Sequence, residues 1–362
     1  MAQLNITNLG GARLSNIELL RLLCMLMVLN LHSFAGWQHG SGYWQAVDFF
    51  RESTSICAVD CFVLISGYFG IHWKFKSFFS LVFQIFFYSI VIYLFAVGIG
   101  IVGWSLTDFA ERFECLFAAE KSWGFVVSYV LLYFCAPLLN ALADKSTSKE
   151  LLTYIIILFM AINFICLPDI VFTYSLVYLI GRLIRKSNMV EKSCHAWRGY
   201  WGATILIFLF VYVVLFKVIG VSNPSRSSTF PLGFIGYSYS APLVIMQAVF
   251  LFLGFAKMNF SSKVVNWCAT SCFAIFLIHM HPTIKEIGYY SFTNGLYEKP
   301  VFQHIVILMG LIIVVFVGSI LIDKIRIVIS NGCFFVVTKA AGFIEQRRSI
   351  TSKINKCFDR IV

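Results

Sequence analysis

Residues 15–35 form an apolar segment that is long enough to cross a lipid bilayer, which takes roughly 20 helical residues. The segment nevertheless contains Glu18, Arg21, Asn30 and His32. An ionised side chain near the centre of a membrane helix costs roughly 2.5–3.5 kcal/mol on insertion scales, so a helix surrounded by lipid would not retain such groups. The sequence therefore predicts a membrane-spanning helix whose polar side chains face protein or a polar cavity.

Three of these polar side chains are expected on one face of the predicted helix. Arg21 and His32 are 11 residues apart, which gives an angular separation of roughly 20° and an axial separation of about 16 Å. Glu18 precedes Arg21 by three residues and lies on the same side. We interpret this face as functional, with an ion pair near one end and an imidazole deep in the span. The structural alternative is that Arg21 reaches the headgroups with Glu18 neutralising it, while His32 caps a neighbouring helix or lies at the far interface.

The composition extends the membrane interpretation to the whole chain. Of its 362 residues 59% are hydrophobic and only 12% are charged, against about 25% charged in soluble domains, and the mean hydropathy is +0.83. The chain is therefore predicted to be an all-α polytopic membrane protein. Its apolar runs predict about ten transmembrane helices, near residues 15–35, 53–71, 77–101, 123–142, 150–167, 169–186, 199–220, 236–256, 264–281 and 301–322.

The distribution of Lys and Arg predicts the orientation of these helices. With the N-terminus in the cytoplasm, 21 of the 28 Lys and Arg residues fall in cytoplasmic segments, as the positive-inside rule requires. We therefore expect both termini inside, with residues 1–14 as a tail, 15–322 as the membrane domain and 323–362 as a basic tail. The net charge of +11 then faces anionic membrane lipids and does not indicate a nucleic-acid partner.

The cysteines and histidines do not form a recognisable metal site. The 11 cysteines are scattered without a C-x-x-C motif, and small buried thiols explain them better than disulfides or metal ligands do. His279 and His281 are two residues apart, so they point in different directions on a helix and should not share a metal ion. We expect no metal and no permanently bound cofactor.

The run at 53–71 contributes further polar groups. Asp60 is a second carboxylate expected to be buried, and Ser66 with Gly67 permits close contact between helices. Tight packing alone and a functional role are both consistent with the Ser-Gly pair.

The segment 123–142 places polar and aromatic residues on one helical face. Tyr129, Tyr133, Pro137 and Asn140 follow one another at intervals of four, four and three residues. This face either lines a polar cavity in which rings stack on a sugar, or forms an aromatic girdle at the membrane interface with a proline kink.

Four motifs in chain order resemble the integral-membrane acyltransferase 3 family, whose members modify bacterial surface polysaccharides. The first comprises Glu18, Arg21 and His32, and the second is AVDCFVLISGYF at residues 58–69. The third is WGFVVSYVLLYFCAPLLN at 123–140, and the fourth is FAIFLIHMHP at 273–282, in which His279 matches the family pattern. The resemblance covers about residues 13–325.

This resemblance implies transfer of an acyl group, usually acetyl from acetyl-CoA, to a hydroxyl of a surface polysaccharide or its lipid-linked precursor in the bacterial plasma membrane. It implies His32 as general base or acyl carrier, with Arg21 and Glu18 in the catalytic group. Arg21, Lys74 and Lys76 would bind the acyl donor, although many members carry arginines after the second helix, and lysine lacks their bidentate geometry. The implied acceptor-binding residues are Asp60, Ser66, Trp123, Tyr129, Tyr133, Asn140 and His279.

Two other functions fit the same pattern of buried charge. A transporter or flippase of a lipid-linked sugar would use the charges along its substrate path. A non-catalytic component of polysaccharide assembly or export would keep the fold without the catalytic activity. A transporter would move intact substrate without acetyl-CoA.

Overall fold

The structure is a computed structural model, and it describes residues 14–33, 43–112, 124–165, 170–219 and 237–358, with the side chains of 43, 44, 75, 76, 286 and 331–358 excluded. These residues form helices and contain no strand, which confirms the predicted all-α class. The α-helices are α1 Ser15–His32, α3 Tyr43–Ser55, α4 Ala58–Phe69, α5 Phe75–Gly98, α6 Leu106–Glu111, α7 Gly124–Lys145, α8 Ser148–Phe164, α9 Ile170–Lys186, α10 Met189–Lys192, α11 Ala196–Phe208, α13 Pro242–Ala256, α14 Lys263–Ala269, α15 Cys272–His279, α16 Ser291–Gly295 and α17 Val301–Phe358. Three further helices are not α-helical: η2 Leu209–Ile219 and η3 Lys285–Tyr290 are π-helices, and η4 Leu296–Glu298 is a 3₁₀-helix.

Several of these helices are suited to a bilayer. Within the described part of the chain, five segments are long and apolar enough to span it: Ser15–His32, Ser77–Gly98, Gly124–Lys145, Ala196–Ile219 and Val301–Ser330. Shorter apolar helices cover Pro242–Ala256 and Lys263–His279. The chain is thus a multi-pass membrane protein, while the number of ten spans and the cytoplasmic location of both termini stay predictions.

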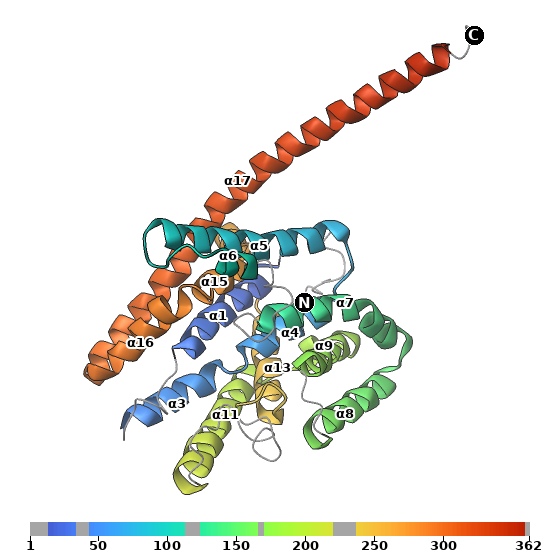
Figure 1. Cartoon of the computed structure of the whole chain (residues 1–362). Coiled ribbons are helices and arrows are strands. Elements are labelled where there is room, and N and C mark those ends of the chain that lie inside the picture. Colours follow the sequence, from blue (N-terminus) through green and yellow to red (C-terminus); the bar gives the residue numbers. More distant parts are fainter. Residues whose placement is uncertain (1–13, 34–42, 113–123, 166–169, 220–236, 359–362) are drawn as a thin grey trace.

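Several predicted helices differ from the structure. The helix expected at 53–71 is two helices, because α3 ends at Ser55 and α4 begins at Ala58. The helix expected at 264–281 is also two helices, because α14 ends at Ala269 and α15 begins at Cys272. The last helix was expected to end at residue 322, but α17 continues to Phe358 and extends away from the other helices (Figure 1). Its 58 residues correspond to a length of about 87 Å, well beyond the thickness of a bilayer.

The centre of the helical bundle is formed by α1, α4, α9 and α13 (Figure 1). Helix α1 packs against α4, α13 and α14, and α4 packs most extensively against α9. The contact between α4 and α9 is close because glycines meet the facing backbone: a Cβ on Gly67 would lie 2.2 Å from the carbonyl oxygen of Tyr178. Two of these helices hold five of the predicted site residues: Glu18, Arg21 and His32 on α1, and Asp60 and Ser66 on α4.

Candidate active site

Two histidines from opposite ends of the chain are in direct contact. His32 is the last residue of α1, and His279 is the last residue of α15. Nδ1 of His32 lies 2.8 Å from Nε2 of His279. On its other side, Nδ1 of His279 lies 2.6 Å from the carbonyl oxygen of Ile275, one turn earlier in α15. His279 is buried, with 4% of its surface exposed, whereas His32 is only half-buried.

These contacts fix the proton positions of both rings in their neutral forms. The carbonyl oxygen of Ile275 can only accept a hydrogen bond, so Nδ1 of His279 carries the proton. Nε2 of His279 is then the acceptor, and the hydrogen between the rings belongs to Nδ1 of His32. Nε2 of His32 is left with its lone pair. His279 thus fixes the tautomer and the orientation of the His32 ring, in the way that a carboxylate orients the histidine of a hydrolase triad.

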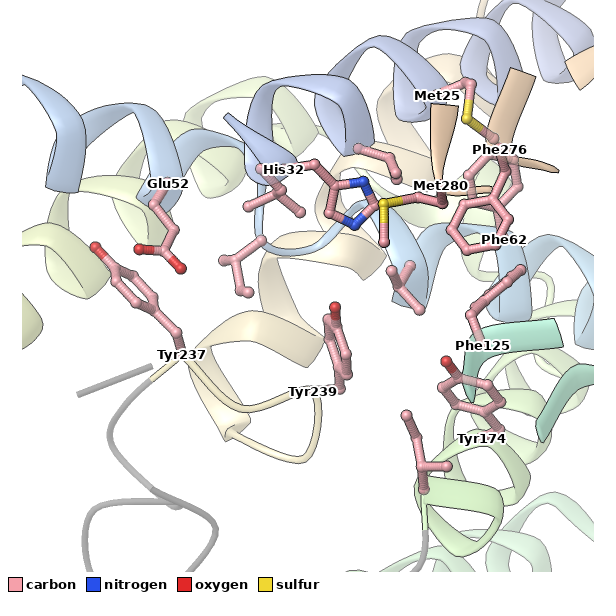
Figure 2. A pocket seen from close by; sticks show the side chains of 15 residues that line it. Met25, His32, Glu52, Phe62, Phe125, Tyr174, Tyr237, Tyr239, Phe276 and Met280 are labelled. Atoms are coloured by element: carbon pink, nitrogen blue, oxygen red, sulfur yellow. The ribbon is translucent and has the colours of Figure 1, made fainter. Parts of the chain in front are cut away.

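His32 lines a cavity of about 380 Å³. One part of the wall carries the polar groups of Glu52, Tyr237 and Tyr239. Another part is largely apolar, with Phe62, Phe125, Phe276, Met25 and Met280, and with Tyr174 beside Phe125. Figure 2 shows the ring of His32 at the boundary between the two parts, facing the space above the hydroxyl of Tyr239. A cavity with an apolar wall and a few convergent polar groups is typical of a small-molecule site.

Glu52 is a cavity residue that the sequence analysis did not single out. It lies near the end of α3 and is 7% exposed. The predicted helix began at residue 53, so Glu52 looked like part of a solvated loop. The available signal was the spacing of Asp48, Arg51 and Glu52, which places three charges on one helical face.

Asn30, by contrast, has a structural role at the end of α1. Its amide nitrogen donates to the Ser55 hydroxyl at 2.8 Å and to the carbonyl oxygen of Arg51 at 3.2 Å. Its carbonyl oxygen accepts from Nε and Nη2 of Arg51, both at 3.1 Å. Arg51 also forms an ion pair with Asp48. This network fastens α1 to α3 and so positions His32.

The ion pair predicted on α1 is present. Nη1 of Arg21 lies 2.9 Å from Oε1 of Glu18, and the side chains are 35% and 7% exposed. Arg21 does not line the cavity with His32, because it lies about 16 Å earlier along α1. The structure therefore places Glu18 and Arg21 together but separates them from the histidine pair.

Asp60 and Ser66 both lie on α4, where Asp60 is buried and Ser66 is half-buried. Asp60 is fully buried, and neither carboxylate oxygen has a hydrogen-bond partner among the described residues. The Ser66 hydroxyl lies 3.1 Å from that of Tyr129 and donates to the carbonyl oxygen of Phe62. Neither Asp60 nor Ser66 lines the cavity.

The polar face of α7 is directed toward the connection between α4 and α5. The Tyr133 hydroxyl lies 3.3 Å from the backbone nitrogen of Lys74. The Asn140 amide donates to the carbonyl oxygen of Ile71 at 2.8 Å, and Tyr178 donates to Asn140 at 2.7 Å. Tyr133 and Asn140, which were predicted to bind the acceptor, thus form hydrogen bonds with the backbone of residues 71–74, where the chain passes from α4 to α5.

Two further predicted site residues cannot be placed in the same way. Trp123 lies outside the described residues, and so does the side chain of Lys76.

A second, cationic cavity of about 300 Å³ lies where α7 and α9 end, lined by Ala143, Asp144, Arg182, Arg185 and Lys186. Nη1 of Arg185 donates to the carbonyl oxygens of Tyr68 and Phe69 at the end of α4. Lys186 donates to the carbonyl oxygen of Ala143 at 2.7 Å. These cations satisfy the free carbonyl groups of helix C-termini, and they give the cavity an excess of positive charge.

Comparison with known proteins gives one family match. The chain matches the acyltransferase domain of the acyltransferase 3 family over residues 14–324, which is nearly its whole length. This chain belongs to the acyltransferase 3 family. No curated protein and no solved structure matches it.

Membership of this family gives the cavity of His32 a chemical meaning. The acyltransferase 3 chain needs a base that can activate a nucleophile, in a site that excludes water. Nε2 of His32 has a lone pair that could take up a proton, and the tautomer of its ring is set by His279 and Ile275. Contact between the first and the fourth sequence motif, carried by α1 and α15, therefore creates this histidine pair.

Proposed function

We propose that this membrane acyltransferase transfers an acetyl group from acetyl-CoA to a hydroxyl of a bacterial surface polysaccharide or its lipid-linked precursor, in the plasma membrane. The observation that supports this most is the pair of His32 and His279 at the edge of a half-polar cavity. Such a pair suits deprotonation of a weakly acidic hydroxyl, which has to be activated before it can attack a thioester.

In the proposed reaction His32 acts as general base. Its Nε2 takes the proton of the acceptor hydroxyl while the hydroxyl oxygen forms a bond to the thioester carbonyl carbon. The carbon–sulfur bond then breaks, and the departing thiolate takes the proton from Nε2, so the products are an ester and free coenzyme A. His279 accepts the hydrogen bond from Nδ1 of His32 throughout and so stabilises the transient imidazolium.

The phosphates of the donor are proposed to bind at the cationic end of the bundle. On α9, Tyr174 lines the cavity of His32, whereas Arg182 and Lys186 line the cationic cavity. The separations along this helix are about 12 Å from Tyr174 to Arg182 and about 18 Å to Lys186. An extended pantetheine arm has a comparable length, so a donor bound there could present its thioester to His32. Lys74 and Arg21 are proposed to contribute to the same binding, as the sequence predicted.

The test is acyl transfer by the purified protein in proteoliposomes, with acetyl-CoA as donor and polysaccharide from the native cells as acceptor. Free thiol release and the mass of the acceptor are measured together. The wild type is expected to add acetyl to the acceptor, and His32→Ala should lower kcat by at least roughly 100-fold. His195→Ala is the matched control, because His195 is exposed at the start of α11 and should leave kcat unchanged.

The opposite results would favour other functions. Movement of intact lipid-linked sugar across the vesicle membrane, without thiol release, would identify a transporter. Wild-type kcat in His32→Ala, with acetyl transfer intact, would place the base elsewhere.

A further inference from the structure

Glu52 presents a carboxyl group to the cavity of His32. It lies on α3 and lines the same cavity, yet only 7% of its surface is exposed. Its Oε2 has no hydrogen-bond partner among the described residues. Figure 2 shows the carboxyl group beside Tyr237, with His32 and Tyr239 bordering the same interior space. A buried polar atom that lacks a protein partner is costly, so its presence in a cavity points to a ligand.

The neighbouring cation does not neutralise Glu52 by direct contact. Nη1 of Arg51 is paired with Asp48, and Nη2 donates to Asn30 and to the hydroxyl of Ser33. Nε of Arg51 also donates to Asn30. Among the described residues Glu52 forms no ion pair, so its carboxyl group is available to a molecule in the cavity.

The protonation of Glu52 follows from this environment. Burial raises the pKa of the Glu52 carboxyl well above its usual range, the carboxylate of Asp48 raises it further, and the charge of Arg51 only partly offsets this. This environment favours the neutral acid form of the carboxyl group. A neutral carboxyl group both donates and accepts hydrogen bonds, as a sugar hydroxyl does.

The walls around Glu52 suit a polyhydroxylated ring. Tyr237 is held beside it, because its hydroxyl donates to the carbonyl oxygen of Phe49 at 2.8 Å and lies 2.9 Å from the Ser53 hydroxyl. In the apolar part of the cavity, the ring centroids of Phe125 and Phe276 are 5.3 Å apart. A sugar has a hydroxylated edge and an apolar face, so it can satisfy both kinds of wall.

We propose that Glu52 is an acceptor-binding residue, which hydrogen-bonds one hydroxyl of a sugar ring while His32 deprotonates another hydroxyl of the same ring. The inference rests on the proposed function, because it takes His32 as the base. It makes the acceptor a molecule with at least two hydroxyls. It also separates recognition of the acceptor, on α3, from activation of its nucleophile, on α1 and α15.

The test compares Glu52→Gln and Glu52→Leu in the reconstituted full-length protein, with acetyl-CoA as donor. The acceptors are a panel of methyl glycosides and, as a probe with a single hydroxyl, n-butanol. Glutamine keeps one donor and one acceptor, so Glu52→Gln should raise the KM for the glycosides less than threefold. Glu52→Leu should raise it roughly tenfold or more, with little change in kcat. Neither variant should alter transfer to n-butanol.

The controls distinguish this inference from the proposed function. Glu191→Leu makes the same change at an exposed carboxylate of α10 and should leave every constant unchanged. An unchanged glycoside KM in Glu52→Leu, with wild-type transfer intact, overturns the role of Glu52 alone. Equal losses of glycoside and butanol transfer in Glu52→Leu overturn it too, because they indicate a general structural defect. Absence of donor turnover in the wild type overturns the proposed function and this inference with it.

Discussion

Gly67 of α4 lies directly against the backbone of Tyr178 in α9, so that a Cβ at residue 67 would be 2.2 Å from the Tyr178 carbonyl oxygen. The contact is reciprocal, because a Cβ at Gly181 would lie 2.5 Å from the carbonyl oxygen of Leu64. Small residues let the two helix backbones approach each other, which is a common way to pack membrane helices. Both cavities depend on this contact, since α9 contributes Tyr174 to one and Arg182 to the other.

The first prediction is that Gly67→Ala destabilises the protein. The added methyl group meets backbone atoms, which cannot rotate away. Overpacking typically lowers the free energy of unfolding by 1–3 kcal/mol, and we expect a loss of about 3 kcal/mol here. The measurement is thermal unfolding in detergent. Gly202→Ala is the control, because a Cβ at Gly202 meets no atom within 4 Å and should raise the melting temperature slightly. Equal melting temperatures for Gly67→Ala and the wild type would contradict the close packing.

The second prediction concerns His279 as the residue that positions His32. His279→Leu removes the acceptor for Nδ1 of His32, so the ring loses its fixed tautomer and orientation. We expect kcat for acetyl transfer to fall roughly 100-fold or more, with a smaller change in the KM for acetyl-CoA.

A conservative variant separates positioning from simple packing. His279→Gln retains an oxygen acceptor for the proton of His32 and should recover part of the lost kcat. His281 serves as the control, because its Nε2 lies 3.0 Å from the carbonyl oxygen of Ser89 and the residue does not line the cavity of His32. His281→Gln should therefore affect thermal unfolding more than kcat. Equal kcat losses in His279→Leu and His279→Gln would mean that the residue acts through packing.

The sequence predicted those parts of the site that depend on local spacing. Glu18 and Arg21 are three residues apart, and helical geometry alone brings them together at 2.9 Å. The contact between His32 and His279 joins residues 247 positions apart, so no local pattern could reveal it. The sequence nevertheless marked both histidines, through a costly polar group in one membrane segment and a family motif in another.

Other parts of the site required the tertiary structure. The residues Tyr129, Tyr133 and Asn140 do share one face of α7, as their spacing predicted. That face meets Ser66 and the reversal at residues 71–74, an arrangement that depends on how α4 and α5 pack against α7. The two explanations of the Ser-Gly pair apply to different residues, since Gly67 provides close packing and Ser66 a hydrogen bond.

The third prediction is that Lys74 contributes to donor binding. Lys74→Ala should raise the KM for acetyl-CoA roughly tenfold, because it removes one contact between a cation and a phosphate. The increase should be smaller for dephosphorylated acetyl-CoA, which has one phosphate fewer. Lys149→Ala is the control, since Lys149 is exposed on α8 and, in the orientation that the Lys and Arg distribution predicts, lies on the cytoplasmic side as Lys74 does. Equal effects of the two variants on the KM for acetyl-CoA would mean that Lys74 does not bind the donor and only contributes to the orientation of the protein in the membrane.

The last prediction separates two roles of Arg21. If Arg21 only places a positive charge at the headgroups, lysine is an adequate replacement. If it contacts the donor while Glu18 holds it, its planar guanidinium matters, and lysine cannot reproduce the bidentate geometry. We expect the second case, in which Arg21→Lys lowers acetyl transfer by roughly 10- to 150-fold, as loss of a charge-assisted contact of about 1.5–3 kcal/mol implies.

A double-mutant cycle tests whether Glu18 acts through Arg21. Because the two side chains are in contact, Glu18→Gln should cost much less activity in the Arg21→Lys background than in the wild type. Acetyl transfer is measured in proteoliposomes for both single variants and the double variant, at equal amounts of inserted protein. Thermal unfolding of the same samples shows whether lost activity reflects lost folding. Near-wild-type transfer by Arg21→Lys, together with additive effects in the cycle, would remove Arg21 from the site and leave the ion pair as a structural feature of α1.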